Sequence, residues 1–304
     1  GQAAAMRRAL ADAGLAASDI KHVNAHGTST PTGDVTEAHS IAAALGAEIC
    51  EIYSDVDGVF TADPRIVHGA RKLSQISYDE MLELAACGAK ILHLRCVEYA
   101  RREGVTVHVR SSFSNNPGTL VTGRISLEEG NAMEEAIISG IAHDRSEAKI
   151  TVVGVPDKPG VAASIFDIIA DQDINVDMIV QNVSAVATGA TDITFTLPMS
   201  DGAKAVESLN AAKDRIGFSE VRYDDKIGKV SVVGVGMRTH PGVTANFFNA
   251  LAKAGINISM ISTSEIRISV VVDVADVDAA VQAAHTAFGL DSDEEAVVYA
   301  GTGR

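Results

Sequence analysis

The chain has 304 residues, and its 46% hydrophobic and 21% charged residues are typical of a folded globular protein. The 40 acidic residues outnumber the 25 basic ones and give a formal charge of -15, which argues against a nucleic-acid partner. No apolar run approaches the roughly 20 residues of a membrane helix, so we expect no membrane association. The three cysteines lack paired ligand spacing, which indicates a reducing, cytoplasmic environment and no metal site.

The first region, residues 1–47, is predicted to hold helices at 2–13 and 35–45 around the short strand IKHVNA. Residues 1–41, with the motif NAHGTSTPTGD, resemble a fragment of the 3-oxoacyl carrier protein synthases, or ketosynthases. In that family the histidine of the motif, here His26, donates a hydrogen bond to a thioester carbonyl, while a separate cysteine carries the acyl chain. No cysteine precedes His26, so we interpret this histidine as a relic of its motif.

The second region, residues 48–129, alternates strand, helix and strand. Strands are expected at 48–56 and 105–112, and one long helix is expected over 77–104 between them. This order is typical of an α/β unit, most simply part of a parallel sheet. The polar stretch TGRISLEEGNAME that follows predicts a linker.

The rest of the chain contains an internal repeat, in which KITVVGV from Lys149 is matched by KVSVVGV from Lys229. In each copy a β-branched strand leads to a Pro-Gly pair, a helix follows, and a second strand begins at INV or INI. The stretches TDITFTLP and IRISVVVD predict third strands, helices follow, and EVRYD and EAVVYA predict fourth strands. Each copy therefore has the β-α-β-β-α-β order of a ferredoxin-like domain, at 130–225 and at 226–304.

The loop before the first helix of the repeat carries Asp157 and the pair Pro159-Gly160. The N–H groups and the dipole at a helix start can receive a carboxylate, and a nearby aspartate can receive an ammonium group. A free amino acid carries both charges. The alternative is that Asp157 only caps the helix and Gly160 only makes a turn, but Pro241-Gly242 repeats the arrangement and favours a binding role.

Both copies resemble ACT domains, which pair side by side and bind amino acids between them. Together with YSDVDGVFTADPR, MLELAACGAKILHLR, TSEIRISV and EEAVVYAGTGR, they give residues 42–304 a resemblance to aspartokinases of the actinobacterial type. The resemblance implies an α/β fold in which a partial amino-acid-kinase-type lobe is followed by two ferredoxin-like ACT domains. It also implies a homodimer through these domains and feedback control by threonine, acting with lysine, in aspartate-family amino-acid biosynthesis.

The resemblance further assigns the binding sites. It places amino-acid effector sites in the first copy at Asp157, Gly160, Ala162, Asn175, Val176, Asp177 and Gln181, and in the second copy at Val243, Thr244, Asn257, Ile258, Thr263 and Ser264. It places a site for ATP with Mg²⁺ at Ser54, Asp55, Phe60, Thr61, Ala62, Asp63, Pro64, Arg65 and Lys90. Acidic side chains can hold Mg²⁺ through water, and Arg65 can meet a phosphate.

Phosphoryl transfer to aspartate depends on positioning and on cations around the γ-phosphate. The family uses an early Lys-x-Gly-Gly motif and a Gly-Arg-Gly-Gly-Ser-Asp loop for this, and neither string occurs in the sequence, so we expect no phosphate anchor and identify no catalytic residue. Three functions remain open: an aspartokinase chain with a nucleotide half-site and a regulatory region, a non-catalytic amino-acid-binding subunit that partners full-length aspartokinase chains, and a condensing enzyme. The stretch AAALGA, at residues 42–47, is interpreted as a junction of two unrelated sequences, made by recombination, design or assembly error.

Overall fold

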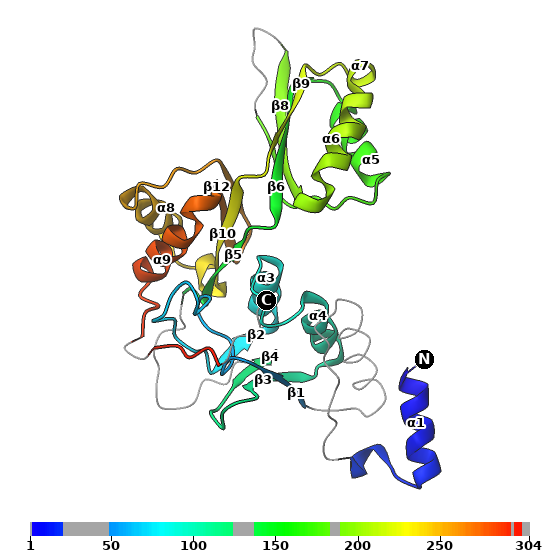
Figure 1. Cartoon of the computed structure of the whole chain (residues 1–304), viewed down its shortest axis with the longest axis vertical. Helices are drawn as coiled ribbons and strands as arrows, with labels where there is room; N and C mark the ends of the chain where they lie inside the picture. The colour runs from blue at the N-terminus through cyan, green and yellow to red at the C-terminus, as the bar shows by residue number, and fades with distance from the viewer. Residues whose placement is uncertain (1, 21–48, 124–136, 183–188, 293–294, 300–304) are drawn as a thin grey trace.

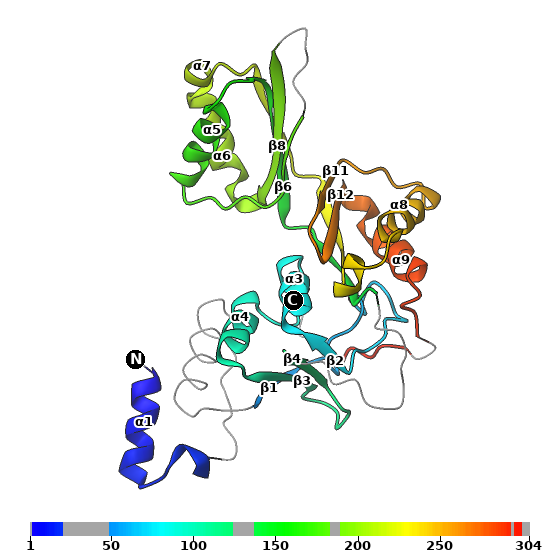
Figure 2. The same cartoon turned by 180° about the vertical axis from the view of Figure 1, so that it is seen from behind.

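The computed structural model describes residues 2–20, 49–123, 137–182, 189–292 and 295–299. The predictions that concern His26, the strand IKHVNA, the helix at 35–45, the junction near residue 47 and most of the linker lie outside these residues. Figures 1 and 2 show three bodies in a row: a sheet near the N-terminal part of the chain, a ferredoxin-like unit in the middle and another at the far end. No helix in the described ranges is long and apolar enough to cross a membrane.

The predicted helix at 2–13 is confirmed as α1 (Gln2–Ala13), which the short 3-10 turn η1 (Ala17–Asp19) follows. The body that comes next, here called the amino-terminal sheet, has the strand order β1-β3-β4-β2. Its strands are β1 (Ile49–Ser54), β2 (Gln75–Ser77), β3 (Thr106–Ser111) and β4 (Thr119–Thr122). The predicted parallel arrangement is confirmed for β1 with β3, whereas β4 runs antiparallel to β3, so the sheet is mixed.

The single helix expected over 77–104 is instead two helices, α3 (Tyr78–Ala86) and α4 (Leu94–Glu103). At the break Gly88 has φ 103°, a left-handed conformation that does not continue a helix, and a side-chain carbon there would collide with the carbonyl oxygen of His143, so the position favours glycine. His93 then caps α4 by accepting a hydrogen bond from the N–H of Arg95 at 3.3 Å. The apolar periodicity of the sequence continues across the break, which is why it predicts one helix.

The first ferredoxin-like unit confirms the predicted element order. Its sheet has the strand order β7-β8-β6-β9 with antiparallel pairing, and α5 and α6 cover one face, as Figure 1 shows. Its elements are β6 (Glu147–Pro156), α5 (Val161–Ala170), β7 (Ile179–Gln181), β8 (Ala190–Pro198), the turn η2 (Met199–Asp201), α6 (Gly202–Ala211), α7 (Lys213–Ile216) and β9 (Glu220–Asp224). Alternate residues of β6 and β8, such as Ile150 and Phe195, are buried in its core.

The second ferredoxin-like unit differs from the prediction at its fourth strand. Its sheet has the order β11-β12-β10-β5, so the edge position belongs to β5 (Gly140–Asp144), which precedes the whole first unit. Its other elements are β10 (Ile227–Val233), the turn η3 (Val235–Arg238), α8 (Val243–Lys253), β11 (Met260–Thr263), β12 (Arg267–Asp273), the turn η4 (Val274–Asp276) and α9 (Val277–Ala287). The first unit is therefore inserted between two paired strands of the second, and β5 lies within the range 130–225 expected for the first domain alone.

Residues 295–299, the described part of the stretch EAVVYA that is expected to be the fourth strand of the second unit, run instead along the amino-terminal sheet. Val298 forms an isolated antiparallel bridge with Val56, and the N–H of Tyr299 donates to the carbonyl of Asp55 at 2.9 Å. The prediction is wrong because β5 already occupies the only free side of β10, pairing from Lys229 with Asp144 to Val233 with Gly140. A strand pattern identifies a strand but does not identify its partner.

A buried ion cluster joins the two ferredoxin-like units. The ammonium group of Lys229, whose side chain is 2% exposed, lies 2.5 Å from a carboxylate oxygen of Glu147 and 2.6 Å from one of Asp177. Burial by itself lowers the pKa of Lys229, but the two carboxylates outweigh it, so the pKa stands above the ordinary lysine value. Met178 and Met260 form an apolar cluster near the same joint.

Replacing Lys229 should weaken folding strongly, because it leaves the carboxylates of Glu147 and Asp177 without their cation. We expect Lys229→Met to lower the free energy of unfolding by roughly 3 kcal/mol, measured by urea denaturation. Because its folded-state pKa is raised, this stabilisation is complete below the unfolded-state pKa and is lost only as the pH rises through the folded-state value.

The matched control is Lys149→Met, which removes a more exposed pair with Asp224 and should cost less than about 1 kcal/mol. Equal losses in the two variants would contradict a special role for the buried cluster.

Candidate functional site

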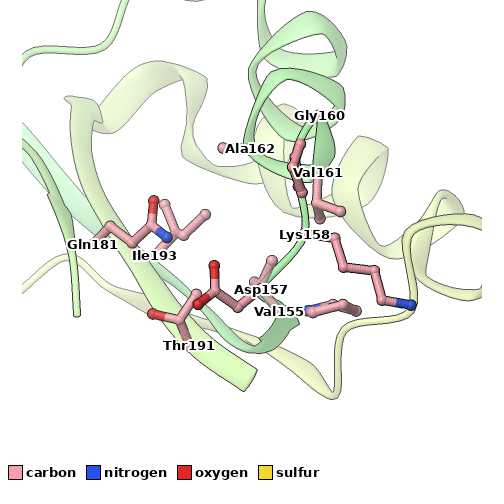
Figure 3. A pocket seen from close by; sticks show the side chains of 11 residues that line it. Val155, Asp157, Lys158, Gly160, Val161, Ala162, Gln181, Thr191 and Ile193 are labelled. Carbon is pink, nitrogen blue, oxygen red and sulfur yellow. The ribbon is translucent and has the colours of Figure 1, made fainter. Parts of the chain in front are cut away.

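A pocket of about 340 Å³ opens at the start of α5 in the first ferredoxin-like unit. Figure 3 shows the side chains of Asp157 and Gln181 extending toward the same space from the loop before α5 and from β7. The end of β6 and one side of β8 form the rest of the wall. The complete lining is Val155, Pro156, Asp157, Lys158, Pro159, Gly160, Val161, Ala162, Gln181, Thr191 and Ile193.

The helix start in this pocket has the geometry of a carboxylate site. Gly160 caps α5 with φ 90°, and a side-chain carbon there would meet nothing within 4 Å, so the backbone conformation alone favours glycine. The first intrahelical N–H bond is that of Ser164 to the carbonyl of Gly160, at 3.0 Å. By helix geometry, the N–H groups of Ala162 and Ala163 precede this bond and lack an intrahelical acceptor. An anion at this position is stabilised by both the N–H groups and the helix dipole.

The polar side chains around the helix start suit the other end of a small zwitterion. Asp157 is exposed and supplies the negative charge that an ammonium group requires. Gln181 supplies an amide that can both donate and accept. The pocket therefore holds a positive helix end and a carboxylate close together, surrounded by Val155, Val161 and Ile193.

The structure brings together four of the seven residues predicted for this site, which are Asp157, Gly160, Ala162 and Gln181. Asn175, Val176 and Asp177 do not line the pocket, and Asp177 instead pairs with Lys229. Among the lining residues that the prediction missed, Thr191 and Ile193 come from β8. Their alternation in TDITFTLP places them on one face of β8, but only the pairing of β8 with β7 shows that this face adjoins Gln181.

The second copy repeats the backbone geometry of the first. Gly242 caps α8 with φ 102°, just as Gly160 caps α5. Val243 is 9% exposed and Ile258 packs against the core, so these two side chains serve packing. The hydroxyl of Ser264 accepts the N–H of Ile266 at 3.4 Å within the turn before β12. The remaining predicted residues, Thr244, Asn257 and Thr263, are exposed.

A second candidate site is loop 54–65, which follows β1 at the end of the amino-terminal sheet where ligands of open α/β folds bind. Its charged groups hold one another in place. A guanidinium nitrogen of Arg65 lies 3.4 Å from a carboxylate oxygen of Asp55, and Asp63 accepts the N–H of Arg65 at 2.9 Å. Asp55 also accepts the hydroxyl of Ser54 at 3.1 Å. Arg65 is more than half exposed, so it can reach a phosphate.

One acidic residue of this loop, Asp57, is buried and accepts several hydrogen bonds from other segments of the chain. It is 8% exposed and accepts hydrogen bonds from the Ser114 hydroxyl at 2.5 Å, the Asn116 amide at 3.1 Å and the Tyr299 hydroxyl at 3.2 Å. The ring of Tyr299 also stacks on Phe113 with a centroid distance of 5.9 Å. Tyr299 thus holds the loop in place, and the alternating pattern of the stretch EAVVYA gives no sign of this role.

Three other residues predicted for the nucleotide site, Phe60, Thr61 and Ala62, are buried or partly buried. Thr61 and Ala62 are 0% and 5% exposed, and Ala62 belongs to the core of the second ferredoxin-like unit. Phe60 is partly buried against the same core. A ligand at this loop therefore does not contact Thr61, which is closed off from solvent, and finds little exposed surface on Ala62. Lys90 lies exposed in the turn between α3 and α4.

Comparison with known proteins gives the class that this fold and these sites define. The sequence profile of the ACT domain matches residues 150–212 and 230–288, and the profile of the amino acid kinase family matches residues 11–111. The chain thus combines an amino acid kinase segment with a pair of ACT regulatory domains. The kinase match overlaps the segment that resembles a ketosynthase fragment, and that resemblance stays a prediction.

Individual relatives name the family. The chain is 62% identical over 272 residues to an aspartokinase of Mycolicibacterium smegmatis and 57% identical to one of Corynebacterium glutamicum, covering 90% of the chain and 64% of each relative. Among solved structures, Clostridium acetobutylicum aspartate kinase and E. coli aspartokinase III match with TM-scores of 0.72 and 0.71, both at 26% identity. These matches cover 84% of the chain and 57% and 55% of the solved chains. The chain belongs to the aspartokinase family and spans about 64% of the length of these curated relatives.

The contacts of Tyr299 with loop 54–65 predict how a conservative substitution of Tyr299 changes the free energy of unfolding. Tyr299→Phe removes the hydroxyl that donates to Asp57 and keeps the stacked ring, so the free energy of unfolding should fall by about 0.5–1.5 kcal/mol. Tyr223→Phe, at an exposed position of β9, should change it by less than about 0.5 kcal/mol. Chemical denaturation of both variants checks this, and an unaltered stability of Tyr299→Phe would show that the hydroxyl contact is dispensable.

Proposed function

We propose that this chain is the amino-acid-binding regulatory part of an aspartokinase, with threonine as its effector and lysine as a second effector. The observation that carries the proposal is the pocket of the first ferredoxin-like unit, where a helix start and Asp157 offer opposite charges to a small zwitterion. E. coli aspartokinase III, which the chain matches with a TM-score of 0.65 and 26% identity, has been solved with lysine and aspartate.

In this proposal, loop 54–65 contributes one half of a nucleotide site, which is completed in a protein of the length of the aspartokinase relatives. Arg65 meets a phosphate, and Asp55 and Asp63 hold ribose hydroxyls or the water shell of Mg²⁺. The support is the position of the loop at the end of β1 and the solved structure of E. coli aspartokinase III with aspartate and ADP. Phosphoryl transfer from ATP to aspartate is then an activity of the longer protein, with this chain supplying the regulatory region.

The second candidate is a regulatory subunit without nucleotide affinity. It is favoured by the way loop 54–65 is used, because Asp57, Thr61 and Ala62 serve packing and internal hydrogen bonds. Such a subunit acts through partner chains. The edge strands β7 and β11 carry the exposed residues Ile179 and Ile261, which support pairing with a second copy or with a full-length aspartokinase chain.

Threonine binding is tested by truncating the amide that faces the pocket. Calorimetry should show that threonine binds the wild-type chain and that Gln181→Ala weakens the affinity by about two- to twelvefold, the equivalent of 0.5–1.5 kcal/mol for one hydrogen bond. Gln172→Ala changes a glutamine of the same unit outside the pocket and should leave the affinity unchanged. Equal affinity of wild type and Gln181→Ala would argue against the assigned pocket, and titration with lysine alone and with both amino acids separates the effectors.

Nucleotide binding is tested separately. Replacing Asp55 and Arg65 together, as Asp55→Asn with Arg65→Gln, should abolish measurable MgATP binding while leaving threonine affinity unchanged, because the two sites lie on different bodies of the protein (Figure 1). Equilibrium dialysis with labelled ATP measures this directly. A wild-type chain that does not bind MgATP would support the regulatory subunit without nucleotide affinity.

A further inference from the structure

A buried histidine links the second ferredoxin-like unit to loop 54–65. His285 is 0% exposed in the last turn of α9, and its Nε2 lies 2.8 Å from the hydroxyl oxygen of Thr61, which is also 0% exposed. The two residues are 224 positions apart in the chain. The other ring nitrogen, Nδ1, lies 2.9 Å from a carboxylate oxygen of Asp291.

The partners of this histidine fix its tautomer. A carboxylate only accepts hydrogen bonds, so Nδ1 carries the proton and donates to Asp291, and Nε2 is left as an acceptor. The hydroxyl of Thr61 therefore donates to Nε2, while its oxygen accepts the N–H of Arg71 at 2.9 Å. Burial lowers the pKa of His285 more than the carboxylate of Asp291 raises it, which keeps the ring neutral in this role.

Thr61 is held at all of its polar atoms. Its N–H donates to the carbonyl of Arg71 at 2.9 Å, and its carbonyl accepts the N–H of Ile141, in β5, at 2.7 Å. The hydroxyl contact to His285 adds a link from α9. Thr61 thus stands where loop 54–65 meets the second unit, two residues before Asp63 and four before Arg65.

The order Asp291, His285, Thr61 resembles the arrangement that activates a nucleophile, but Thr61 is sealed from solvent, so no substrate can reach its hydroxyl. The hydrogen bonds instead couple the position of α9 to the position of loop 54–65. Further contacts run in parallel to them: Gln282 donates to the carbonyl of Ile66 at 2.9 Å, and Ala70 forms a bridge with Asp291.

We propose that His285 is a positioning residue for the nucleotide site: through Thr61 it sets where Asp63 and Arg65 stand. A displacement of α9 then moves loop 54–65, so the position of the second ferredoxin-like unit affects the geometry of the nucleotide site. This inference rests on the proposed nucleotide role of loop 54–65, and the test below separates the two.

The test uses the full chain and two readouts, the affinity for MgADP and the amide hydrogen exchange of residues 55–65. His285→Leu keeps the bulk and removes both ring nitrogens, so MgADP should bind roughly tenfold more weakly and the loop amides should exchange faster. His285→Gln keeps an acceptor near the position of Nε2 and should restore the affinity to within about threefold of wild type. If His285 served only to fill space in the core, His285→Gln would not recover the MgADP affinity.

The matched control is Asn246→Ala. The amide of Asn246, in the neighbouring helix α8, donates an exposed hydrogen bond to the carbonyl of Ala287 at the end of α9, so its loss removes one hydrogen bond of α9 and leaves the contact between His285 and Thr61 in place. MgADP affinity and loop exchange should equal those of wild type. Thr61→Val should match His285→Leu, and the double variant should be no weaker than either single one, because both remove the same link.

Each result decides the inference. If wild type binds MgADP and His285→Leu binds it equally well, the positioning role is wrong and the nucleotide role stands. If wild type does not bind MgADP, the nucleotide role fails and exchange alone decides: faster exchange confined to residues 55–65 and reversed in His285→Gln supports the positioning role, whereas uniform or absent acceleration overturns it. Should His285→Leu not fold, Thr61→Val and His285→Gln give the same comparison.

Discussion

The second ferredoxin-like unit cannot close its core with its own consecutive residues, and this constraint shapes the whole chain. Its sheet requires β5, which precedes the first unit, and its core includes Ala62 from loop 54–65 and Val67 and Ala70 from the segment after that loop. Val230, Phe247 and Val281 pack in the same cluster. Since apolar burial is the main stabilising contribution, the second unit, β5 and this segment are expected to fold together.

The first ferredoxin-like unit is an insertion in this assembly and has a complete sheet and core of its own. Its attachment to the rest runs through β6 and β10, which lie end to end in Figures 1 and 2, and through Lys229 with its two carboxylates. One of those carboxylates, Asp177, precedes β7, and β7 carries Gln181 into the amino-acid pocket. Ligand binding and the joint between the units therefore share a short segment of chain.

Much of this organisation follows from the sequence alone. The duplicated Pro-Gly pair identifies both helix starts, and the alternation in β6 and β8 identifies the strands of the first core. The effector site is predicted in part from the local pattern, because Asp157 and Gly160 belong to one loop and helix start. Ala162, in α5, and Gln181, in β7, enter the prediction through the family resemblance.

The remaining features depend on contacts that no local pattern carries. Gly88, at the break between α3 and α4, lies against the carbonyl of His143, the fourth strand of the second unit is β5 in place of 295–300, and the hydroxyl of Thr61 bonds to His285. Asp177 is assigned to the pocket by the family resemblance, and it pairs instead with Lys229 because the second unit adjoins it there. In each case the partner lies more than 50 positions away.

The central claim is that the start of α5 and Asp157 together bind the two charges of a free amino acid. A crystal structure of the chain grown with saturating threonine tests it most directly. The account predicts the threonine carboxylate at the N–H groups of Ala162 and Ala163, with its ammonium group facing Asp157. Threonine bound elsewhere, or an empty pocket at saturation, would contradict it.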